Sequence, residues 1–398
     1  LDRLDQDTRP ENFDVTFRVD GNGRVNALEI VERGPLSFSG RDGALGHVQG
    51  LARDFKALPE AGIMLRDVTI GLDAVPEKRE QFELTFRVGM EGRIEAVSII
   101  DRTALHALSR AEAVERIRQL ARDFHAAPDA RIALTAAIGS VTALEKFTAR
   151  EKFELVYRVG LDHTVRAVSI IETTIGRASD RAATREYIAQ LGRDFNAAPG
   201  APITLKNFAD TVGASLETFT ITATFDRFDN SGHFYLENFK NLMPITLSAG
   251  MTTGSYAQQL SRDFNPVNGS LIILNDVTGS DMVTISTRFR VENGELRVTA
   301  FVLYGQNFDN IQKLQTYIER NLGTISDNFR GYLVNGTLDG LRGNFTVVVN
   351  PSNGQLGVTR AEFAKQDNLT LARLETFRTA ANALPTFTGT LARDTVLD

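Results

Sequence analysis

One short motif recurs along this chain at nearly constant spacing, and it constrains the fold more than any other feature. The motif is a leucine followed two residues later by Arg-Asp-Phe, and its aspartates are Asp54, Asp123, Asp194 and Asp263. Successive copies are about 70 residues apart, which is longer than most solenoid repeats and suits a row of small modules. We therefore expect a tandem array in which each module carries the motif at the end of a helix.

The sequence around each motif predicts two strands, a helix and a third strand. In the second copy, residues 82–88 and 93–100 alternate apolar and polar side chains, as half-buried strands do. Ser109 with Glu112 is a capping box that begins the helix, and residues 131–138 form the closing strand. The predicted fold class is α+β: a tandem array of about six small modules. Each is a strand-strand-helix-strand two-layer sandwich, with the helix on one face of three antiparallel strands.

The repeat also predicts the domain boundaries. Modules of this size are small for a single core, so we expect each to lean on its neighbours, or its closing strand to pair with the next module's first strand. Short charged linkers such as residues 75–80 and 144–151 favour a semi-rigid rod. The predicted domains are a polar lead-in, 1–11, and six repeat modules, 12–80, 81–151, 152–218, 219–282, 283–343 and 344–398.

We assign the repeated motif a structural role, with a repeated ligand site as the alternative. Its arginine lies in the last helical turn, where a cation suits the helix dipole, and its phenylalanine continues the apolar helical face into the core. Its aspartate is expected to cap the helix or to pair with a strand arginine such as Arg87 or Arg158. Four equivalent copies argue against catalysis, which normally needs one site. The motif residues are Arg53, Asp54, Phe55, Arg122, Asp123, Phe124, Arg193, Asp194, Phe195, Arg262, Asp263 and Phe264.

The sequence offers no constellation for catalysis, so we predict a protein that is not an enzyme. The five histidines occupy non-equivalent places, and no His-x-x-x-His pair, Gly-x-Ser-x-Gly motif or Walker-type loop occurs. The absence of cysteine excludes disulfides and thiolate chemistry. Residues 226–232 suggest a calcium loop, but Arg227 takes the first ligand position and Asn238 the twelfth, so we interpret them as a hairpin turn. No cofactor or metal is expected, with calcium in the turns or linkers as the alternative.

Charge and hydropathy bear on partners and location. A net charge of −6 over 398 residues gives no footprint for nucleic acid, and no apolar run is long enough for membrane insertion. The lack of cysteine, and the enrichment in Asn, Thr, Gly and Ser in the second half, favour an extracellular or cell-surface location, with the periplasm as the alternative. The start at Leu1, without methionine or signal peptide, is interpreted as a processed product or an excerpt from a longer array.

One stretch resembles a known domain family. Residues 84–100, Leu-Thr-Phe-Arg-Val-Gly-Met-Glu-Gly-Arg-Ile-Glu-Ala-Val-Ser-Ile-Ile, resemble the strand-turn-strand signature at POTRA domain junctions. The resemblance covers the hairpins alone, and the chain predicts one helix per module where POTRA domains carry two. It implies a periplasmic scaffold that captures peptides by adding strands to exposed sheet edges.

These observations lead to a functional hypothesis with two alternatives. The leading one is a non-enzymatic structural repeat protein of the bacterial cell surface: a stalk, adhesin segment, surface-layer piece or filament subunit. The first alternative is the POTRA-like binding scaffold, and the second is an enzyme with its site between modules. Neither end carries a clear polar cap, so the expected partners are other copies of the chain or flanking modules, joined head to tail by self-assembly.

Overall fold

The computed structural model of the chain has two compact units. Unit 1 comprises Leu1–Gly176, Tyr187–Lys206 and Phe225–His233, and unit 2 comprises the remainder, Arg177–Glu186, Asn207–Thr224 and Phe234–Asp398. The residues that the structure describes are 13–71, 79–103, 105–139, 151–174, 176–212, 215–225, 234–279, 281–304, 316–317, 320–323, 343–349 and 356–363.

Two strands, a helix and a third strand follow one another repeatedly along the described chain, with a short extra strand before two of the helices. The first three rounds contain β1 (Phe13–Val19), β2 (Val25–Phe38), α1 (Arg41–Asp54), β3 (Gly62–Ile70), β4 (Glu80–Val88), β5 (Ile94–Asp101), β6 (Leu105–Leu108), α2 (Arg110–Asp123), β7 (Ala126–Gly139), β8 (Glu151–Val159), β9 (Val165–Glu172), α3 (Arg181–Asp194) and β10 (Pro202–Val212). The remaining elements are β11 (Ser215–Phe225), β12 (Phe234–Asn241), β13 (Ile245–Thr246), α4 (Thr253–Phe264), β14 (Pro266–Thr278), β15 (Thr284–Glu292), β16 (Glu295–Tyr304), β17 (Gly343–Val349) and β18 (Leu356–Phe363).

The strand pairing corrects one expectation. Three antiparallel strands were expected beside each helix, but the strands before and after a helix run parallel: β2 with β3, β5 with β7, β9 with β10, and β12 with β14. A helix that crosses over the sheet returns the chain to the end where the previous strand began, so the next strand runs in the same direction. Within a repeat, it is the hairpin before the helix that is antiparallel, as in β1–β2 and β4–β5.

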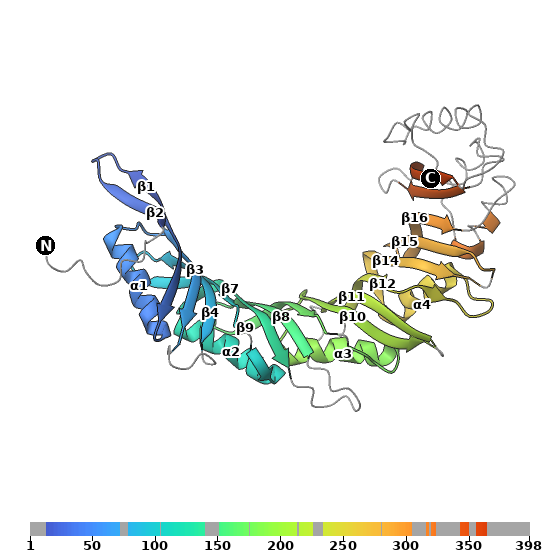
Figure 1. Cartoon of the computed structure of the whole chain (residues 1–398), viewed down its shortest axis with the longest axis horizontal. Helices are drawn as coiled ribbons and strands as arrows, with labels where there is room; N and C mark the ends of the chain where they lie inside the picture. Colours follow the sequence, from blue (N-terminus) through green and yellow to red (C-terminus); the bar gives the residue numbers. More distant parts are fainter. Residues whose placement is uncertain are drawn as a thin grey trace. The chain divides into compact units, whose positions relative to one another are not determined.

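The closing strands do pair onward, as the small module size predicted. In unit 1, β3 pairs antiparallel with β4 and β7 with β8, and in unit 2, β14 pairs antiparallel with β15. The sheets are therefore mixed, and the described residues lie mostly in strands, with few helices among them. In unit 1, α1 and α2 lie on the same face of the strands (Figure 1).

The helices bury their apolar faces against the sheet. Ser109 and Glu112 form the predicted capping box at the start of α2. Phe124, which follows α2, is fully buried and contacts the Phe82 and Phe86 rings edge-on, with centroids 5.5 and 6.3 Å away. Phe195 and Phe264 are also fully buried, whereas Phe55 is only half-buried.

Several expectations lie wholly or largely outside the described residues. They are the lead-in at 1–11, the linkers at 75–80 and 144–151, the turn at 226–232, the helices at 310–321 and 370–383, and the closing strand at 388–396. None of the helices in the described ranges is long and apolar enough to cross a membrane.

Candidate functional site

The first residue of α1, α2 and α3 is an arginine in each case, at Arg41, Arg110 and Arg181. A cation is out of place there, because the N-terminus of a helix carries partial positive charge. All three arginines instead contact two acids from the repeat that follows, and these acids overcome the unfavourable helix dipole. We call each set a junction cluster; its members are the helix-start arginine, a glutamate near the start of the next repeat's first strand, and the aspartate of the next Arg-Asp-Phe motif.

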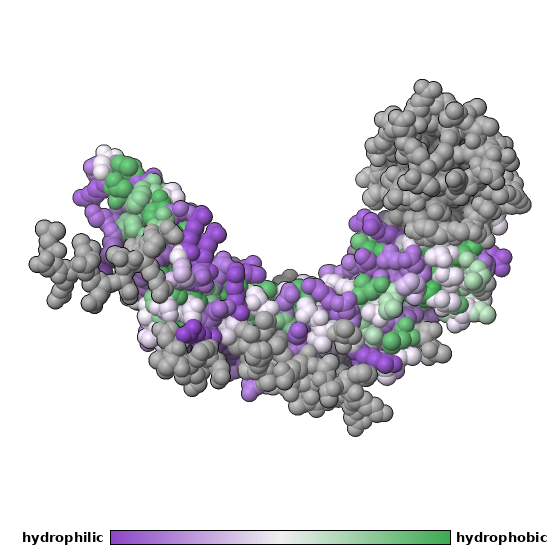
Figure 2. Space-filling model, viewed as in Figure 1, coloured by the Kyte–Doolittle hydropathy of each residue, from purple (hydrophilic) through white to green (hydrophobic). Residues whose placement is uncertain are grey.

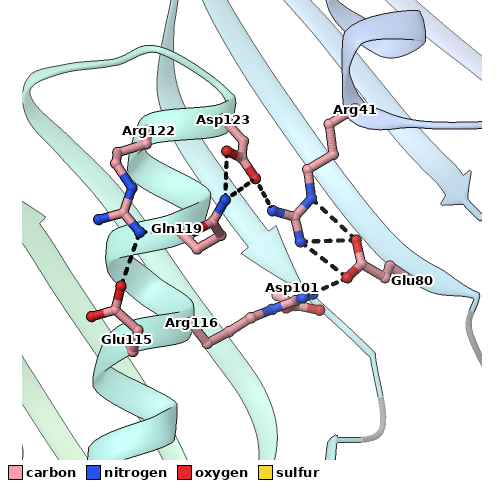
Figure 3. A network of polar contacts seen from close by, with 8 residues as sticks. All are labelled: Arg41, Glu80, Asp101, Glu115, Arg116, Gln119, Arg122 and Asp123. Atoms are coloured by element: carbon pink, nitrogen blue, oxygen red, sulfur yellow. Dashed lines mark hydrogen bonds and ion pairs between the residues drawn. The ribbon is translucent and has the colours of Figure 1, made fainter.

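In the first junction cluster, Arg41 binds Glu80 through the edge of its guanidinium formed by Nε and Nη2 (Figure 3). Its Nε donates to Glu80 Oε2 at 3.2 Å, and its Nη2 donates to Oε1 at 3.0 Å and to Oε2 at 3.1 Å. Its Nη1 donates to Asp123 Oδ2 at the end of α2. One side chain therefore ties the start of α1 to the first strand and the helix end of the next repeat.

Arg116 of α2 adds a second cation to this cluster. It donates to Glu80 Oε1, and its Nη2 donates to Asp101 Oδ2 at 2.8 Å. The Asp101 side chain is fully buried at the end of β5. Two arginines thus face three carboxylates, Glu80, Asp101 and Asp123.

The second junction cluster repeats this geometry around Arg110. Its Nη2 donates to Glu151 Oε1 at 2.7 Å and its Nη1 to Asp194 Oδ2 at 2.7 Å. Burial acts to lower the pKa of Arg110, but its hydrogen bonds and charge interactions with these acids outweigh burial and raise the pKa, so the guanidinium stays charged. Tyr187 occupies the helix position that Arg116 holds in the first cluster, and its hydroxyl donates to Glu151 Oε1 at 3.0 Å.

Because a tyrosine stands where the first cluster has its second arginine, the second cluster contains one arginine and three acids. These acids are Glu151, Asp194 and Glu172, which lies at the end of β9. Burial first, and then the charge of Glu151, raise the pKa of Glu172 to about 8, although a hydrogen bond with Tyr187 and the charge of Arg110 oppose the rise. At neutral pH the Glu172 carboxyl is therefore mainly protonated and uncharged.

The third junction cluster lies within unit 2. Arg181 Nη1 donates to Asp263 Oδ2 at 2.7 Å and its Nη2 to Glu217 Oε2 at 3.1 Å. Tyr256 donates to the same Glu217 oxygen, and the Arg181 guanidinium lies 5.0 Å from the centre of the Tyr256 ring. In this cluster the neutral Asn241 occupies the strand position that Asp101 and Glu172 hold in the other two. Its Nδ2 donates to the backbone carbonyls of Met243 and Asn275.

Across the three clusters, the residue at the end of the second strand changes together with the residue at the middle position of the next helix. With Arg116 on the helix the strand residue is an aspartate, with Tyr187 it is a glutamate whose pKa is raised to about 8, and with Tyr256 it is an uncharged asparagine. At this strand position the negative charge is thus weakened or absent where the helix residue is not a cation, which avoids an uncompensated buried charge there.

The structure corrects the partner expected for the motif aspartate. Asp123, Asp194 and Asp263 pair with the helix-start arginines of the preceding repeat, not with a strand arginine. Arg87 instead pairs with Glu95, its register partner on the antiparallel strand β5, and with Glu60. Arg158 pairs with Asp129 of β7.

The motif arginines lie in the last turn of their helices, at Arg53, Arg122, Arg193 and Arg262. Arg122 donates to Glu115 at 2.9 Å and Arg193 to Gln190 at 2.7 Å, both within their own helices. Sequence reasoning missed the helix-start arginines. The available signal was an arginine 13 residues before the motif aspartate in three successive copies, at a helix end that disfavours cations.

No three His, Asp or Glu side chains are arranged to hold a metal ion in the part of the chain that the structure describes. In the junction clusters the carboxylates pair with arginines from the preceding repeat, and this geometry suits joining segments of the chain.

Comparison with known proteins adds no identification. No protein-family model matches the chain, and neither does any curated protein. Among solved structures, a sex pheromone precursor from Lactobacillus salivarius subsp. salivarius UCC118 aligns over 74% of this chain and 100% of its own, with 11% identity and a TM-score of 0.19. A likeness at that TM-score carries no argument about fold or function.

Proposed function

We propose that this chain is a non-enzymatic structural repeat protein, built as a tandem array of about six strand-strand-helix-strand modules. It acts as a stalk, adhesin segment, surface-layer piece or filament subunit outside the cell. The observation that carries the proposal is the junction cluster, which recurs with the same three residue types at three successive module boundaries.

The clusters support a mechanical role because each joins two modules through three separate elements. Arg110 and Glu151 have side chains that are 18% and 8% exposed, so the two modules meet there through charges that are largely shielded from water. Breaking one side of such a buried pair typically costs about 3–5 kcal/mol, whereas exposed pairs contribute about 0–1 kcal/mol. Two modules joined in this way resist bending and pulling as one body.

The absence of cysteine and the polar composition of the second half support a location outside the cytoplasm. Protease treatment of intact source cells, followed by detection with an antibody against the chain, tests that location. Retention of the intact chain in the cytosolic fraction would overturn it.

A double-mutant cycle tests the junction itself. Arg110→Met and Asp194→Asn, alone and together, are compared by urea unfolding and by hydrogen exchange of the β7 and β8 amides. We expect a coupling of about 1–3 kcal/mol, as for residues in one ion-pair network. Arg158→Met is the matched control, because its pair with Asp129 is exposed, and it should change stability by less than about 1 kcal/mol. Additivity of the two cluster variants would reject the mechanical role of the cluster.

A second candidate, the binding scaffold that captures peptides by strand addition, is favoured by one observation. The described pairing of β1 is with β2, on one of its two edges. Val88 N–H of β4 donates across the junction to Ala61 O at 3.0 Å, and Val19 occupies the same position in β1. Val19→Pro removes that donor. Loss of binding to an immobilised peptide library on this change would support the scaffold, and no binding by either chain would reject it.

A further inference from the structure

The first repeat presents one half of a junction cluster, at the end of α1. Asp54 occupies the position of Asp123, Asp194 and Asp263, each of which contacts a helix-start arginine. Asp54 itself pairs with its neighbour Arg53 at 3.2 Å, and the two side chains are 65% and 79% exposed. An exposed pair of adjacent residues holds an aspartate weakly, so its carboxylate remains accessible to a better partner.

The apolar residues beside Asp54 are exposed where their counterparts are buried. Phe17 and Val19 of β1 are 48% and 64% exposed, whereas Phe86 and Val88, which hold the same positions in β4, are 0% and 5% exposed. Val25 and Leu28 of β2 are also exposed, and Figure 2 shows the resulting hydrophobic patch on the β1–β2 hairpin. We call this patch, together with Asp54, the open face.

At the internal junction the corresponding surface is covered by the closing strand of the preceding repeat. Glu60 N–H donates to Val88 O at 2.7 Å and Val88 N–H to Ala61 O at 3.0 Å. Strand β3 then pairs antiparallel with β4 along its length. β1 has the same alternation of residues as β4, and its outer edge can form the same pairing.

We propose that the open face binds a further repeat of the same kind: a closing strand that pairs antiparallel with β1, and a helix whose first arginine contacts Asp54. This inference rests on the proposed function, because it extends the internal junctions to one more.

This occupant fits better than two other candidates. A second copy that paired its own β1 with β1 would bring no helix-start arginine to Asp54. An unrelated peptide strand would cover Phe17 and Val19 but would leave the carboxylate without a cation. The internal junctions satisfy all three requirements together: strand pairing, apolar cover and a guanidinium.

An extended chain provides the probe. Residues 1–79 are joined directly to residues 11–398, which places the added Arg41 82 residues before the original Asp54, the separation of Arg41 and Asp123. The chain has no cysteine, so Val19→Cys in the original β1 is a single reporter thiol. Its rate of reaction with Ellman's reagent is measured in the extended chain and in the original chain.

We expect the extension to slow the reaction of this thiol at least about tenfold, which corresponds to ~1.4 kcal/mol of closure. Arg41→Gln in the added repeat alone should restore part of the reactivity. Met90→Cys, in an exposed turn, should react equally in both chains, and Val88→Cys should be protected in both, since Met90 is 81% and Val88 5% exposed.

Two results would overturn the proposal. One is an unprotected thiol in an extended chain whose circular dichroism shows the added repeat folded. The other is protection in the unextended chain that grows with protein concentration, which would identify a second copy as the occupant. If the first extension does not fold, a second one is made by placing residues 81–150 before residue 11. In that chain the added Arg110 lies 84 residues before Asp54, which is the separation of Arg110 and Asp194. The two proposals can fail separately. If the double-mutant cycle shows coupling between Arg110 and Asp194 but the Val19→Cys thiol of the extended chain is unprotected, the open-face proposal is rejected and the proposed function stands.

Discussion

Replacing Glu172 by glutamine should stabilise unit 1 increasingly as the pH rises. Glu172 is 1% exposed, and burial is the first cause that raises its pKa to about 8, from an ordinary value of 4.5. Glutamine keeps the shape of the side chain, but it carries no charge at any pH. The substitution therefore isolates the cost of ionising this carboxyl inside the second junction cluster.

The sign of the effect follows from proton binding. Between pH 4.5 and pH 8 the folded chain binds the Glu172 proton more tightly than the unfolded chain does. The stability that protonated Glu172 contributes is therefore fully present below pH 4.5 and is lost as the pH rises through about 8. The difference between the two pKa values corresponds to roughly 5 kcal/mol. The gain from Glu172→Gln should grow from about 1 kcal/mol at pH 5 to roughly 4–5 kcal/mol at pH 9.

Urea unfolding at pH 5, 7 and 9, followed by circular dichroism, measures this gain, and hydrogen exchange of the β8 and β9 amides locates it. Glu154→Gln is the matched control, because Glu154 lies on the neighbouring strand β8 with an exposed side chain. Its effect should vary little with pH. If the two variants showed parallel pH profiles, the argument that Glu172 holds a proton in the folded state would be refuted.

Four further results are expected. Phe124→Ala should cost about 3–5 kcal/mol in urea unfolding, while Phe17→Ala, at an exposed ring, should cost less than about 1 kcal/mol; equal costs would contradict the burial argument. Gly192→Ala should lower the free energy of unfolding by about 1–3 kcal/mol, because its Cβ would lie 2.4 Å from the Phe225 ring. Adding Phe225→Val should recover most of this loss, since the preceding repeats have Ala and Val at these two positions. If the second substitution recovered nothing, the argument that the two side chains are matched in size would be rejected. Asp210→Asn should make the free energy of unfolding of unit 2 vary less with pH near pH 6. Burial raises the pKa of this aspartate to about 6, and the stability that its protonated form contributes is lost as the pH rises through that value. An unchanged dependence on pH would contradict this. EDTA should leave the thermal midpoint within about one degree, and a large fall would place calcium in the turns or linkers.

Local pattern was enough to place most elements, because strands and helices bury their side chains at different periods. Alternation predicted the hairpin strands β4 and β5, and the Ser109–Glu112 capping box predicted the start of α2. The helical phase of Phe124 predicted its burial. Each of these depends on residues close together in the sequence.

Two features could not be obtained in that way. The parallel pairing of β2 with β3 depends on the path of α1 across the sheet, which no local pattern records. The partner of Asp123 is Arg41, 82 residues earlier, and either residue alone is unremarkable in sequence. A single motif copy could not distinguish a helix cap, a strand arginine or a distant arginine as the partner.

The sequence by itself determined the repeat length, the order of elements and the apolar faces, because these follow from local periodicity and from spacing along one chain. Only the tertiary structure decided what the Arg-Asp-Phe aspartate does, because its charge is compensated across a boundary between repeats. It also separated the equivalent copies: Asp123 lies in a junction cluster while Asp54 lies exposed, although the sequence around both is nearly the same. The difference arises from what packs against each repeat, and packing between distant segments is a property of the folded chain.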